Sequence, residues 1–581
     1  MKKPFFPGAS SLIQISIILV FCIVITGPVF ANVRIWATGC TEKVQYDNRS
    51  ELPHDRIWDE STKTVKINGV RGEHVPFQIV ITADRVNVSG ITLEKSELKT
   101  GTDIIPPGNI QLYYEHLIKV YAPSGSHGEK GYWPDALVPL TRPFDIRSGV
   151  RGRPPEFKQQ PVWIDIIVPD SQSPGIYKGA ITVSSDEGNL GEINIELTVW
   201  DITMPAERHF PTLIRIGPRD VARMHGLDES SPEFKVLYTK YLEHALNSRV
   251  DPRYLMSFGL EGRIENENYI LEWIDNDIED FFVEKGLTMY QISAAPPGIA
   301  FESGEEPFSE LYKHYVSQYI TQVIAHAREK GWDDKIGFLC PVDEPRNAEE
   351  YEAIRRWASI VKDVDPKVNF MVTEQPLPEN PEWGSFAGFA NYWIVHGNYL
   401  AYDNHVQAIV ERQQAGDKVI WYISCDQEYP QPNYFIDREA ADSRMVSWIT
   451  WRYQLGGILY WTSTFWREVK DPWIDPITWK LSGCNDPLSG EGSLIYPGNM
   501  AERYTGQENV FGPVSSIRLE LLREGLEEIE LLYLLKESGG QKAADKIVES
   551  ICKGVRDFTR DPNEIDEARE KIIWEILKRM K

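Results

Sequence analysis

Residues 335–374, KIGFLCPVDEPRNAEEYEAIRRWASIVKDVDPKVNFMVTE, contain a strand, a helix and a second strand in succession. The runs 335–340 and 368–373 are short and apolar, as is typical of strands buried on both faces. Residues 348–364 between them carry apolar side chains at helical spacing. A strand–helix–strand unit of this length predicts two parallel strands joined by a crossover helix. The stretch therefore places this part of the chain in the α/β class.

The same alternation continues on both sides of this stretch for about 300 residues. This length favours a (β/α)₈ barrel over residues 206–510, with a doubly wound open sheet as the alternative topology. No Gly-x-Gly-x-x-Gly follows an early strand, so nothing indicates a dinucleotide cofactor. The other expected helices are 232–248, 310–330, 405–414 and 438–455, and the other expected strands are 392–395, 419–424 and 457–461.

The chain has a different character before residue 205 and after residue 510. Residues 32–205 hold short β-branched runs separated by Gly, Pro, Asn and Asp clusters, a pattern that predicts a β-sandwich. Residues 511–581 carry Leu and Ile at helical spacing and are expected to be a helical segment that packs on the rest. The sequence thus predicts a multidomain protein, with a β-sandwich, a (β/α)₈ barrel and a helical tail.

Composition narrows the possible partners. The chain has 581 residues, 42% of them hydrophobic and 25% charged, as in a soluble globular protein. Its net charge of −25 argues against binding of nucleic acid or an anionic membrane surface. The sequence has no His-Glu-x-x-His and no Cys-x-x-Cys, so no metal or other cofactor is expected. Cys340 and Cys425 each end an apolar run and are expected to be buried strand residues.

The first 31 residues resemble a targeting segment. Lys2 and Lys3 precede an uncharged, mostly apolar run over residues 12–30, and Val29-Phe30-Ala31 suits signal peptidase cleavage. The alternative is an uncleaved membrane anchor, because the apolar run is almost long enough to span a bilayer. In either case we expect an exported protein (periplasmic, secreted or on the cell surface). The sequence predicts no oligomeric state.

Two acids follow the expected strand 335–340. Asp343 and Glu344 come directly after it, at the carboxyl end where barrel enzymes place their active sites. Pro345 favours a non-helical exit for Glu344, so the chain can turn both side chains inward. The alternative is a solvated loop in which one acid caps the next helix. Other polar residues at strand ends are Glu374, His396 and Asp426, which we expect to be supporting rather than catalytic groups.

Tryptophan is concentrated in residues 421–473, which contain six of them. Exposed indoles offer a large flat area with little rotamer entropy, which suits stacking against sugar rings. Trp461 and Trp466 are the candidates for the floor of a sugar site. Trp448 and Trp451 lie three apart on an expected helix and are assigned to core packing.

Several motifs together resemble glycoside hydrolase family 123, and the resemblance spans nearly the whole exported chain. It implies a β-sandwich followed by a barrel, and a β-N-acetylgalactosaminidase that uses the acetamido group of its own substrate. The motifs are Gly72-Glu-His-Val-Pro-Phe-Gln78, Trp133-Pro-Asp135, Pro161-Val-Trp-Ile-Asp165, Pro341-Val-Asp-Glu-Pro345, Asp442-Ser-Arg444, Gly457-Ile-Leu-Tyr-Trp461, Gly492-Ser-Leu-Ile-Tyr-Pro-Gly498 and Ile517-Arg-Leu-Glu-Leu-Leu-Arg-Glu-Gly525.

By this resemblance, Glu344 is the general acid/base and Asp343 orients the acetamido group. Tyr422 or Tyr460 would then donate to the acetamido oxygen. Trp393 and His396 are further candidate substrate-binding residues. The chain has Asn391-Tyr392-Trp393 where the family has Asp-x-Trp, which bears on sugar specificity. Asp135 and Asp165, in the first domain, are expected to be structural.

Two other functions fit the same residues. A conventional retaining glycosidase would use Glu344 as the acid and Glu374 or Asp426 as the nucleophile. A non-catalytic carbohydrate-binding surface protein would keep the aromatic cleft but would not need Glu344.

Overall fold

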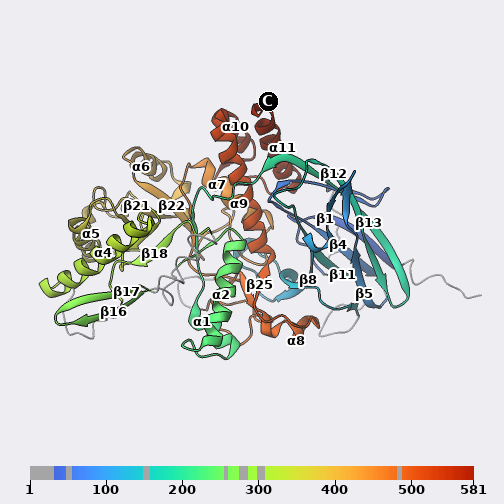
Figure 1. The fold of residues 1–581 in the computed structure, drawn as a ribbon, viewed down its shortest axis with the longest axis horizontal. Coiled ribbons are helices and arrows are strands. Elements are labelled where there is room, and N and C mark those ends of the chain that lie inside the picture. Colours follow the sequence, from blue (N-terminus) through green and yellow to red (C-terminus); the bar gives the residue numbers. More distant parts are fainter. Residues whose placement is uncertain are drawn as a thin grey trace, which may run out of the picture.

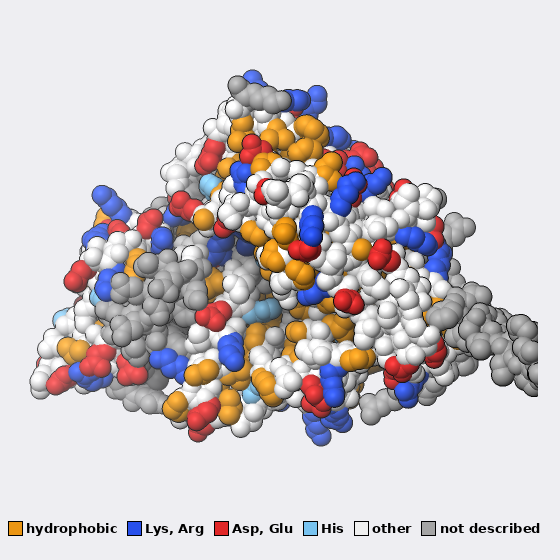
Figure 2. Space-filling view, turned by 45° about the vertical axis from the view of Figure 1, so that its right-hand side comes forward, with side chains coloured by type: hydrophobic (Ala, Val, Ile, Leu, Met, Phe, Trp, Pro, Cys, Tyr) orange, Lys and Arg blue, Asp and Glu red, His pale blue; other side chains and the backbone are white. Residues whose placement is uncertain are grey.

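The computed structural model describes residues 32–46, 55–84, 86–147, 157–253, 260–273, 286–297, 308–480 and 487–580. The predicted signal peptide, residues 1–31, lies outside them. Within the described residues, no helix combines the length and the apolar character needed to span a membrane. On the face shown in Figure 2, acidic and basic side chains are interspersed rather than gathered by sign.

The N-terminal part consists of two sheets that share one hydrophobic core. Strand β13 (Gly188–Thr203) shows how the sequence produces this arrangement, because Ile193, Ile195, Leu197 and Val199 alternate with more exposed residues along it. Alternation of this kind buries one face of a strand and leaves the other to solvent. The first sheet contains, in spatial order, β1 (Val33–Gly39), β4 (His74–Asp84), β11 (Phe157–Ile167), β8 (Ile110–Val120) and β9 (Gly131–Pro139). The second sheet contains β10 (Phe144–Ile146), β5 (Val88–Lys95), β12 (Gly175–Ser185), β13, β3 (Thr64–Arg71) and β2 (Trp58–Asp59), and the short strands β6 (Leu98–Thr100) and β7 (Asp103–Ile105) lie beside it.

A nearly closed barrel of eight parallel strands follows. Its strands lie side by side in chain order, and within the part of the chain that the structure describes, the gap in the hydrogen-bonded path falls between the second and the third. The strands are β14 (Thr212–Arg215), β15 (Asp251–Arg253), β18 (Tyr290–Ser293), β19 (Ile336–Leu339), β20 (Asn369–Val372), β21 (Tyr392–His396), β22 (Lys418–Ile423) and β23 (Ile458–Tyr460). Among the described residues, the helices around it are α1 (Pro218–His225), α2 (Pro232–Asn247), α4 (Glu310–Lys330), α5 (Ala348–Val364), α6 (Asp403–Gln414) and α7 (Ala441–Arg452).

The unit that predicted the α/β class is confirmed. Strands β19 and β20 are parallel neighbours, buried at every position, and α5 connects them. Asn347 caps α5 by accepting the backbone N–H of Glu350, a common way to begin a helix. The barrel departs from strict strand–helix alternation between β20 and β21, which are joined by the short 3₁₀ helix η5 (Pro381–Trp383).

Helix α9 (Ile517–Leu535) runs between the N-terminal sheets and the barrel (Figure 1). The sequence predicted a helical segment that packs on the rest, and almost all of α9 is buried, including its charged residues. The strands before it, β24 (Ile495–Pro497) and β25 (Pro513–Ser516), extend the first N-terminal sheet, with β25 beside β9. The chain therefore returns from the barrel to the first domain before its last helices, α10 (Gln541–Ile551) and α11 (Pro562–Arg579).

Candidate active site

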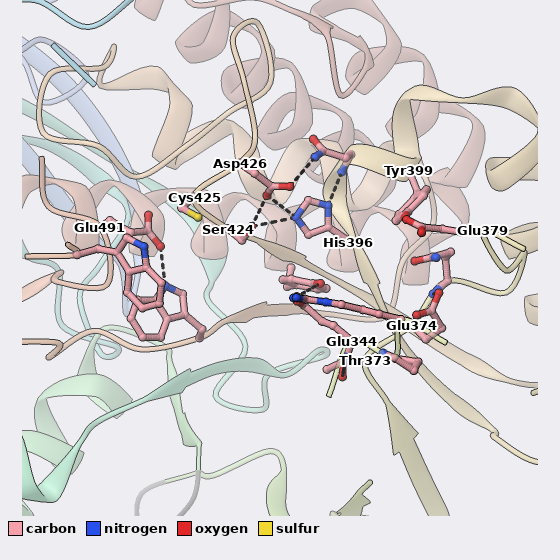
Figure 3. Close-up of a pocket in the computed structure, with 17 residues that line it drawn as sticks. Glu344, Thr373, Glu374, Glu379, His396, Tyr399, Ser424, Cys425, Asp426 and Glu491 are labelled. Carbon is pink, nitrogen blue, oxygen red and sulfur yellow. Dashed lines mark hydrogen bonds and ion pairs between the residues drawn. The ribbon is translucent and has the colours of Figure 1, made fainter. Parts of the chain in front are cut away.

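A cavity of about 490 Å³ opens at the carboxyl ends of barrel strands β19 to β23 (Figure 3). In a parallel barrel, side chains from several strands converge at this end, which is why such sites are built there. Glu491 and Cys425 lie at one side of the view, and Glu374, Glu379 and Tyr399 lie at the other. The wall is formed by Glu344, Pro345, Arg346, Thr373, Glu374, Gln375, Glu379, His396, Asn398, Tyr399, Tyr422, Ser424, Cys425, Asp426, Trp461, Trp479 and Glu491.

Asp343 and Glu344 are connected through Thr373, the first residue after β20. The Thr373 hydroxyl donates a hydrogen bond to Oδ1 of Asp343 at 2.5 Å and accepts the backbone N–H of Glu344 at 3.2 Å. Both residues are exposed, but Glu344 lines the cavity, whereas Asp343 lies beside it and does not belong to the wall. One hydroxyl group therefore holds both predicted catalytic acids.

The backbone of Glu344 is strained. Its φ is +45°, in the left-handed region that residues with a Cβ seldom adopt, and Pro345 follows it. Such conformations persist only where the surroundings fix them, and they concentrate at functional sites. Here the backbone bond to Thr373 and a 2.5 Å hydrogen bond from the Tyr422 hydroxyl to Oε1 of Glu344 hold the residue.

Glu374 lies in the same cavity but in a different environment. Burial is the largest cause that raises its pKa, to about 8, with smaller contributions from the charges of Glu379 and Glu344. A carboxyl with this pKa is protonated at neutral pH and is then a poor nucleophile. Glu379, on the same side of the cavity, accepts a 2.7 Å hydrogen bond from the Tyr399 hydroxyl.

Asp426 has the opposite ionisation. Burial would raise its pKa, but the hydrogen bond and charge of His396, together with the Ser424 hydroxyl, hold it at about 2. His396 Nε2 lies 2.9 Å from Oδ1 of Asp426, and its Nδ1 accepts the backbone N–H of Asn398. Both oxygens of Asp426 are occupied, since Asn398 Nδ2 donates to Oδ2 at 3.2 Å. These bonds fix His396 and Asp426 as a connected polar group on the wall.

Two indoles form the aromatic side of the cavity. The rings of Trp461 and Trp479 meet edge to face with centroids 4.9 Å apart. Trp461 Nε1 donates a 2.5 Å hydrogen bond to Oε1 of Glu491, which is almost completely buried. Burial raises the pKa of Glu491 to about 7. The wall thus combines flat apolar surface with a carboxyl that orients one of its rings.

Three predicted substrate-binding residues require correction, because the structure places them in the core rather than on the cavity wall. Trp393 packs beside Phe386 and donates to Asp417. Trp466 donates from Nε1 to Ser493, and the Tyr460 hydroxyl accepts the backbone N–H of Gly492. All three are fully buried, because their strand or loop positions face the packing layer around the barrel. Tyr422, Trp461 and His396 do line the cavity.

Two other expectations also change. Cys425 was expected to be a buried strand residue, but it is half-buried, lies after β22 on the cavity wall and is disulfide-bonded. Asn391 lies just before β21, at the end of that strand away from the cavity, and its side chain bonds the backbone of Val368 and Phe370. The departure from the family pattern at Asn391 therefore affects the contact between β20 and β21, not the wall of the cavity.

Family profiles match both parts of this architecture. The "Glycoside hydrolase 123, catalytic domain" profile matches residues 290–535, which include every residue of the cavity wall. The "Glycoside hydrolase 123 N-terminal domain" profile matches residues 42–185. This chain belongs to glycoside hydrolase family 123. It is therefore a glycosidase, and the matches confirm the resemblance carried by its motifs.

Comparison with solved structures supports the fold through a relative from the same family. A family 123 glycoside hydrolase from Clostridium perfringens, described for glycolipid glycan hydrolysis, has a TM-score of 0.68 at 16% identity, covering 94% of this chain and 98% of that one. A family 39 glycoside hydrolase from the gut symbiont Bacteroides cellulosilyticus has a TM-score of 0.32 at 9% identity, covering 75% and 81% of the two chains. A search of curated proteins finds no match.

Sequence reasoning missed part of this cavity wall. Trp479 and Glu491 follow the last barrel strand in irregular segments, where no periodicity marked them. Glu491 directly precedes the Gly492–Gly498 motif that helped to carry the resemblance, and this position was the available signal. Among the described residues, no group of three or more His, Cys, Asp or Glu side chains is placed to hold a metal ion.

Proposed function

We propose that this family 123 glycosidase removes terminal β-linked N-acetylhexosamine, specifically N-acetylgalactosamine, from glycans by a retaining, substrate-assisted mechanism. The observation that carries the proposal is the bridge from Thr373 to Asp343 and Glu344 at the mouth of an aromatic-walled cavity. It gives one site two adjacent carboxyl groups with different surroundings. Glu344 lines the cavity, and Asp343 lies beside the wall and accepts a hydrogen bond from the Thr373 hydroxyl.

In the first step, Glu344 donates its proton to the glycosidic oxygen as the bond from that oxygen to C1 breaks. The acetamido oxygen of the sugar attacks C1 from the opposite face, so an oxazolinium ion forms and the leaving group departs as an alcohol. Asp343 accepts the acetamido N–H and stabilises the positive charge that develops. Substrate assistance of this kind is a known exception to the usual pair of protein carboxylates.

In the second step, Glu344 acts as a base. It accepts a proton from water while the water oxygen attacks C1 and the bond from C1 to the acetamido oxygen breaks. Two inversions at C1 give overall retention. Tyr422 holds the Glu344 carboxylate during this exchange through its hydrogen bond to Oε1, and Trp461 and Trp479 offer the sugar ring a flat surface.

The chemistry of the other acids supports this choice over a conventional two-carboxylate mechanism. With a pKa of about 8, Glu374 is protonated at neutral pH. Asp426 is ionised, but its oxygens are occupied by His396, Ser424 and Asn398. A nucleophile must be both ionised and free to approach C1. Neither residue meets both requirements.

We further infer that the enzyme is exported and acts on glycoconjugates outside the cytoplasm. Residues 1–31 have the charge and apolar pattern of a signal peptide. The disulfide at Cys425 is typical of oxidising compartments. The Clostridium perfringens relative is described for glycolipid glycan hydrolysis, which makes glycolipid glycans the first natural substrates to test. We also infer that the two N-terminal sheets form a β-sandwich that supports the barrel.

The test is a panel of chromogenic β-glycosides offered in pairs, with and without the 2-acetamido group. The proposal expects cleavage of the acetamido sugar with retention at C1, and no cleavage of its 2-hydroxy partner, which has no internal nucleophile. Comparable cleavage of both partners would instead support a conventional mechanism. Binding of the sugars without cleavage, unchanged in Glu344→Gln, would support a carbohydrate-binding protein.

A further inference from the structure

A buried ion pair links the N-terminal sheet to the loop that carries Glu491. Asp135 lies in β9, and Arg518 lies in the first turn of α9. Arg518 Nε donates to Oδ1 of Asp135 at 2.8 Å, and its Nη2 donates to Oδ2 at 2.7 Å. Both side chains are essentially unexposed, at 1% and 0%. This bidentate geometry is the strongest form of an arginine–carboxylate pair.

Asp135 reaches Arg518 because β9 is irregular at this point. The pairing of β8 and β9 shifts between His116 and Leu117, so Asp135 is the extra residue of a β-bulge. A bulge redirects a side chain that regular alternation would place elsewhere. Tyr496 adds a 2.5 Å hydrogen bond from its hydroxyl to Oδ2 of Asp135. The carboxylate is therefore fixed from two directions.

The remaining donors of Arg518 hold the backbone around Glu491. Nη2 donates to the carbonyl of Ser493 at 2.6 Å, and Nη1 donates to the carbonyls of Gly490 at 3.0 Å and Tyr434 at 2.7 Å. All five N–H groups of the guanidinium are thus used. Two of these N–H groups donate to loop carbonyls on either side of Glu491, those of Gly490 and Ser493.

The two glycines that flank Glu491 are closely packed. Gly490 has φ +86°, and a Cβ there would lie 2.8 Å from Nη1 of Arg518. Gly492 has φ +67°, and a Cβ there would lie 2.4 Å from the Trp461 ring. The loop is therefore packed between the guanidinium and the indole, with Glu491 bonded to Trp461 Nε1. One short segment therefore connects the Arg518 guanidinium to the Trp461 indole.

We propose that Asp135 is a positioning residue for the sugar site, acting through Arg518 and the Glu491 loop on Trp461. The N-terminal domain is then part of the binding apparatus and not only its support. The inference rests on the proposed function, in that the cavity beside Trp461 is taken as the site of the amino sugar. Stacking on an indole contributes to the bound substrate and to the transition state alike, so its loss raises KM more than it lowers kcat.

The chain offers a matched control. Arg569 in α11 donates from Nη2 to both oxygens of Glu73, and this pair also joins the N-terminal domain to a C-terminal helix. It is buried to a similar degree, at 9% and 2% exposed. Neither residue lines the cavity. Asp135→Asn and Glu73→Gln each replace one carboxylate oxygen by an amide nitrogen that faces an arginine N–H.

The experiment compares these two variants with the full-length enzyme, well below their melting temperatures. Both variants should have a lower melting temperature than wild type. Only Asp135→Asn should raise KM for the aryl N-acetylgalactosaminide, by about tenfold, and its kcat should change less. Calorimetry with the thiazoline mimic of the intermediate should show a matching loss of affinity. In a Trp461→Phe background, Asp135→Asn should cost no further affinity, because the two changes act through one contact.

Equal changes in KM for the two variants, or an undiminished effect of Asp135→Asn in the Trp461→Phe background, would overturn the proposal. If Asp135→Asn does not fold, Arg518→Lys provides the test. Lysine keeps a positive charge beside Asp135 but cannot also donate to the loop carbonyls of Gly490 and Ser493. An unchanged KM in Arg518→Lys would again overturn it. A wild-type enzyme that neither cleaves nor binds the amino sugar would instead contradict the proposed function.

Discussion

Tyr422 and Glu344 are joined by a hydrogen bond of 2.5 Å from the phenol to Oε1, although Tyr422 lies in β22 and Glu344 follows β19, two strands that are not neighbours. Burial, and then the charge of Glu344, raises the pKa of Tyr422 well above its ordinary value. The phenol therefore remains a donor over the whole range in which a glycosidase works. This bond orients one oxygen of the Glu344 carboxyl, and the Arg346 guanidinium lies 3.6 Å from the other.

We expect Tyr422→Phe to lower kcat/KM by about 10- to 100-fold, because a charge-assisted hydrogen bond to the reacting carboxyl is lost. The measurement is steady-state kinetics on the aryl amino sugar. Tyr399→Phe is the matched control, since Tyr399 donates a similar bond to Glu379 in the same cavity. An equal loss in both variants would mean that the cavity is generally disturbed and that Glu344 has no special dependence on Tyr422.

Glu374→Gln should change the dependence of stability on pH. The pKa of Glu374 is about 8 in the folded protein against an ordinary 4.5. Between these values the unfolded chain releases the proton and the folded chain keeps it, so wild-type stability falls as pH rises towards 8. Glutamine does not titrate, so the variant lacks this decrease in stability with rising pH. The melting temperature of the variant should therefore exceed that of wild type by a margin that grows from pH 5 to pH 8 and then levels off.

The control for this experiment is Glu349→Gln, which removes an exposed carboxylate from the first turn of α5. Melting is followed by calorimetry at each pH. A constant difference between Glu374→Gln and wild type across the range would contradict the raised pKa. It would also restore Glu374 as an ionised candidate for the nucleophile.

The parts of the fold that the sequence predicted are those governed by local periodicity. The parallel pair β19 and β20 with α5 between them follows from apolar runs and helical spacing alone. Residues at strand ends were found for the same reason, since Glu344, Tyr422, His396 and Trp461 all line the cavity. In a barrel, chain order fixes which strands are neighbours, so a strand end is enough to predict convergence.

What was missed depends on contacts between distant segments. Periodicity does not distinguish a tryptophan that faces the packing layer from one that faces the cavity, which is why Trp466 was assigned to the site and Trp479 was not. The burial of the charged residues of α9 has no local signal, because their partners lie far away in the sequence, as Asp135 does from Arg518. The addition of β24 and β25 to the first sheet likewise has no local signal.

Thr373→Val should separate the two acids from their common hydroxyl. Valine keeps the β-branched shape but neither donates to Asp343 nor accepts the backbone N–H of Glu344. We expect kcat to fall by about tenfold or more, as for the loss of a group that orients catalytic residues. Thr373→Ser keeps the hydroxyl and should retain most of the activity. If the serine variant is as impaired as the valine variant, packing of the methyl group matters and the bridge does not.

The final prediction separates the roles of Glu344 and Asp343. Glu344→Gln removes the proton donor, so it should impair substrates with poor leaving groups far more than those with activated aryl groups, which depart with little protonation. Asp343→Asn keeps the shape but removes the charge that faces the forming oxazolinium, so it should impair both substrate classes alike. It should also weaken binding of the thiazoline mimic, because the lost interaction grows as the intermediate forms. Kinetics on a series of aryl amino sugars with leaving groups of graded acidity make the comparison. A steeper dependence on the leaving group in Asp343→Asn than in Glu344→Gln would exchange the two assignments, and Asp343 would then be the proton donor.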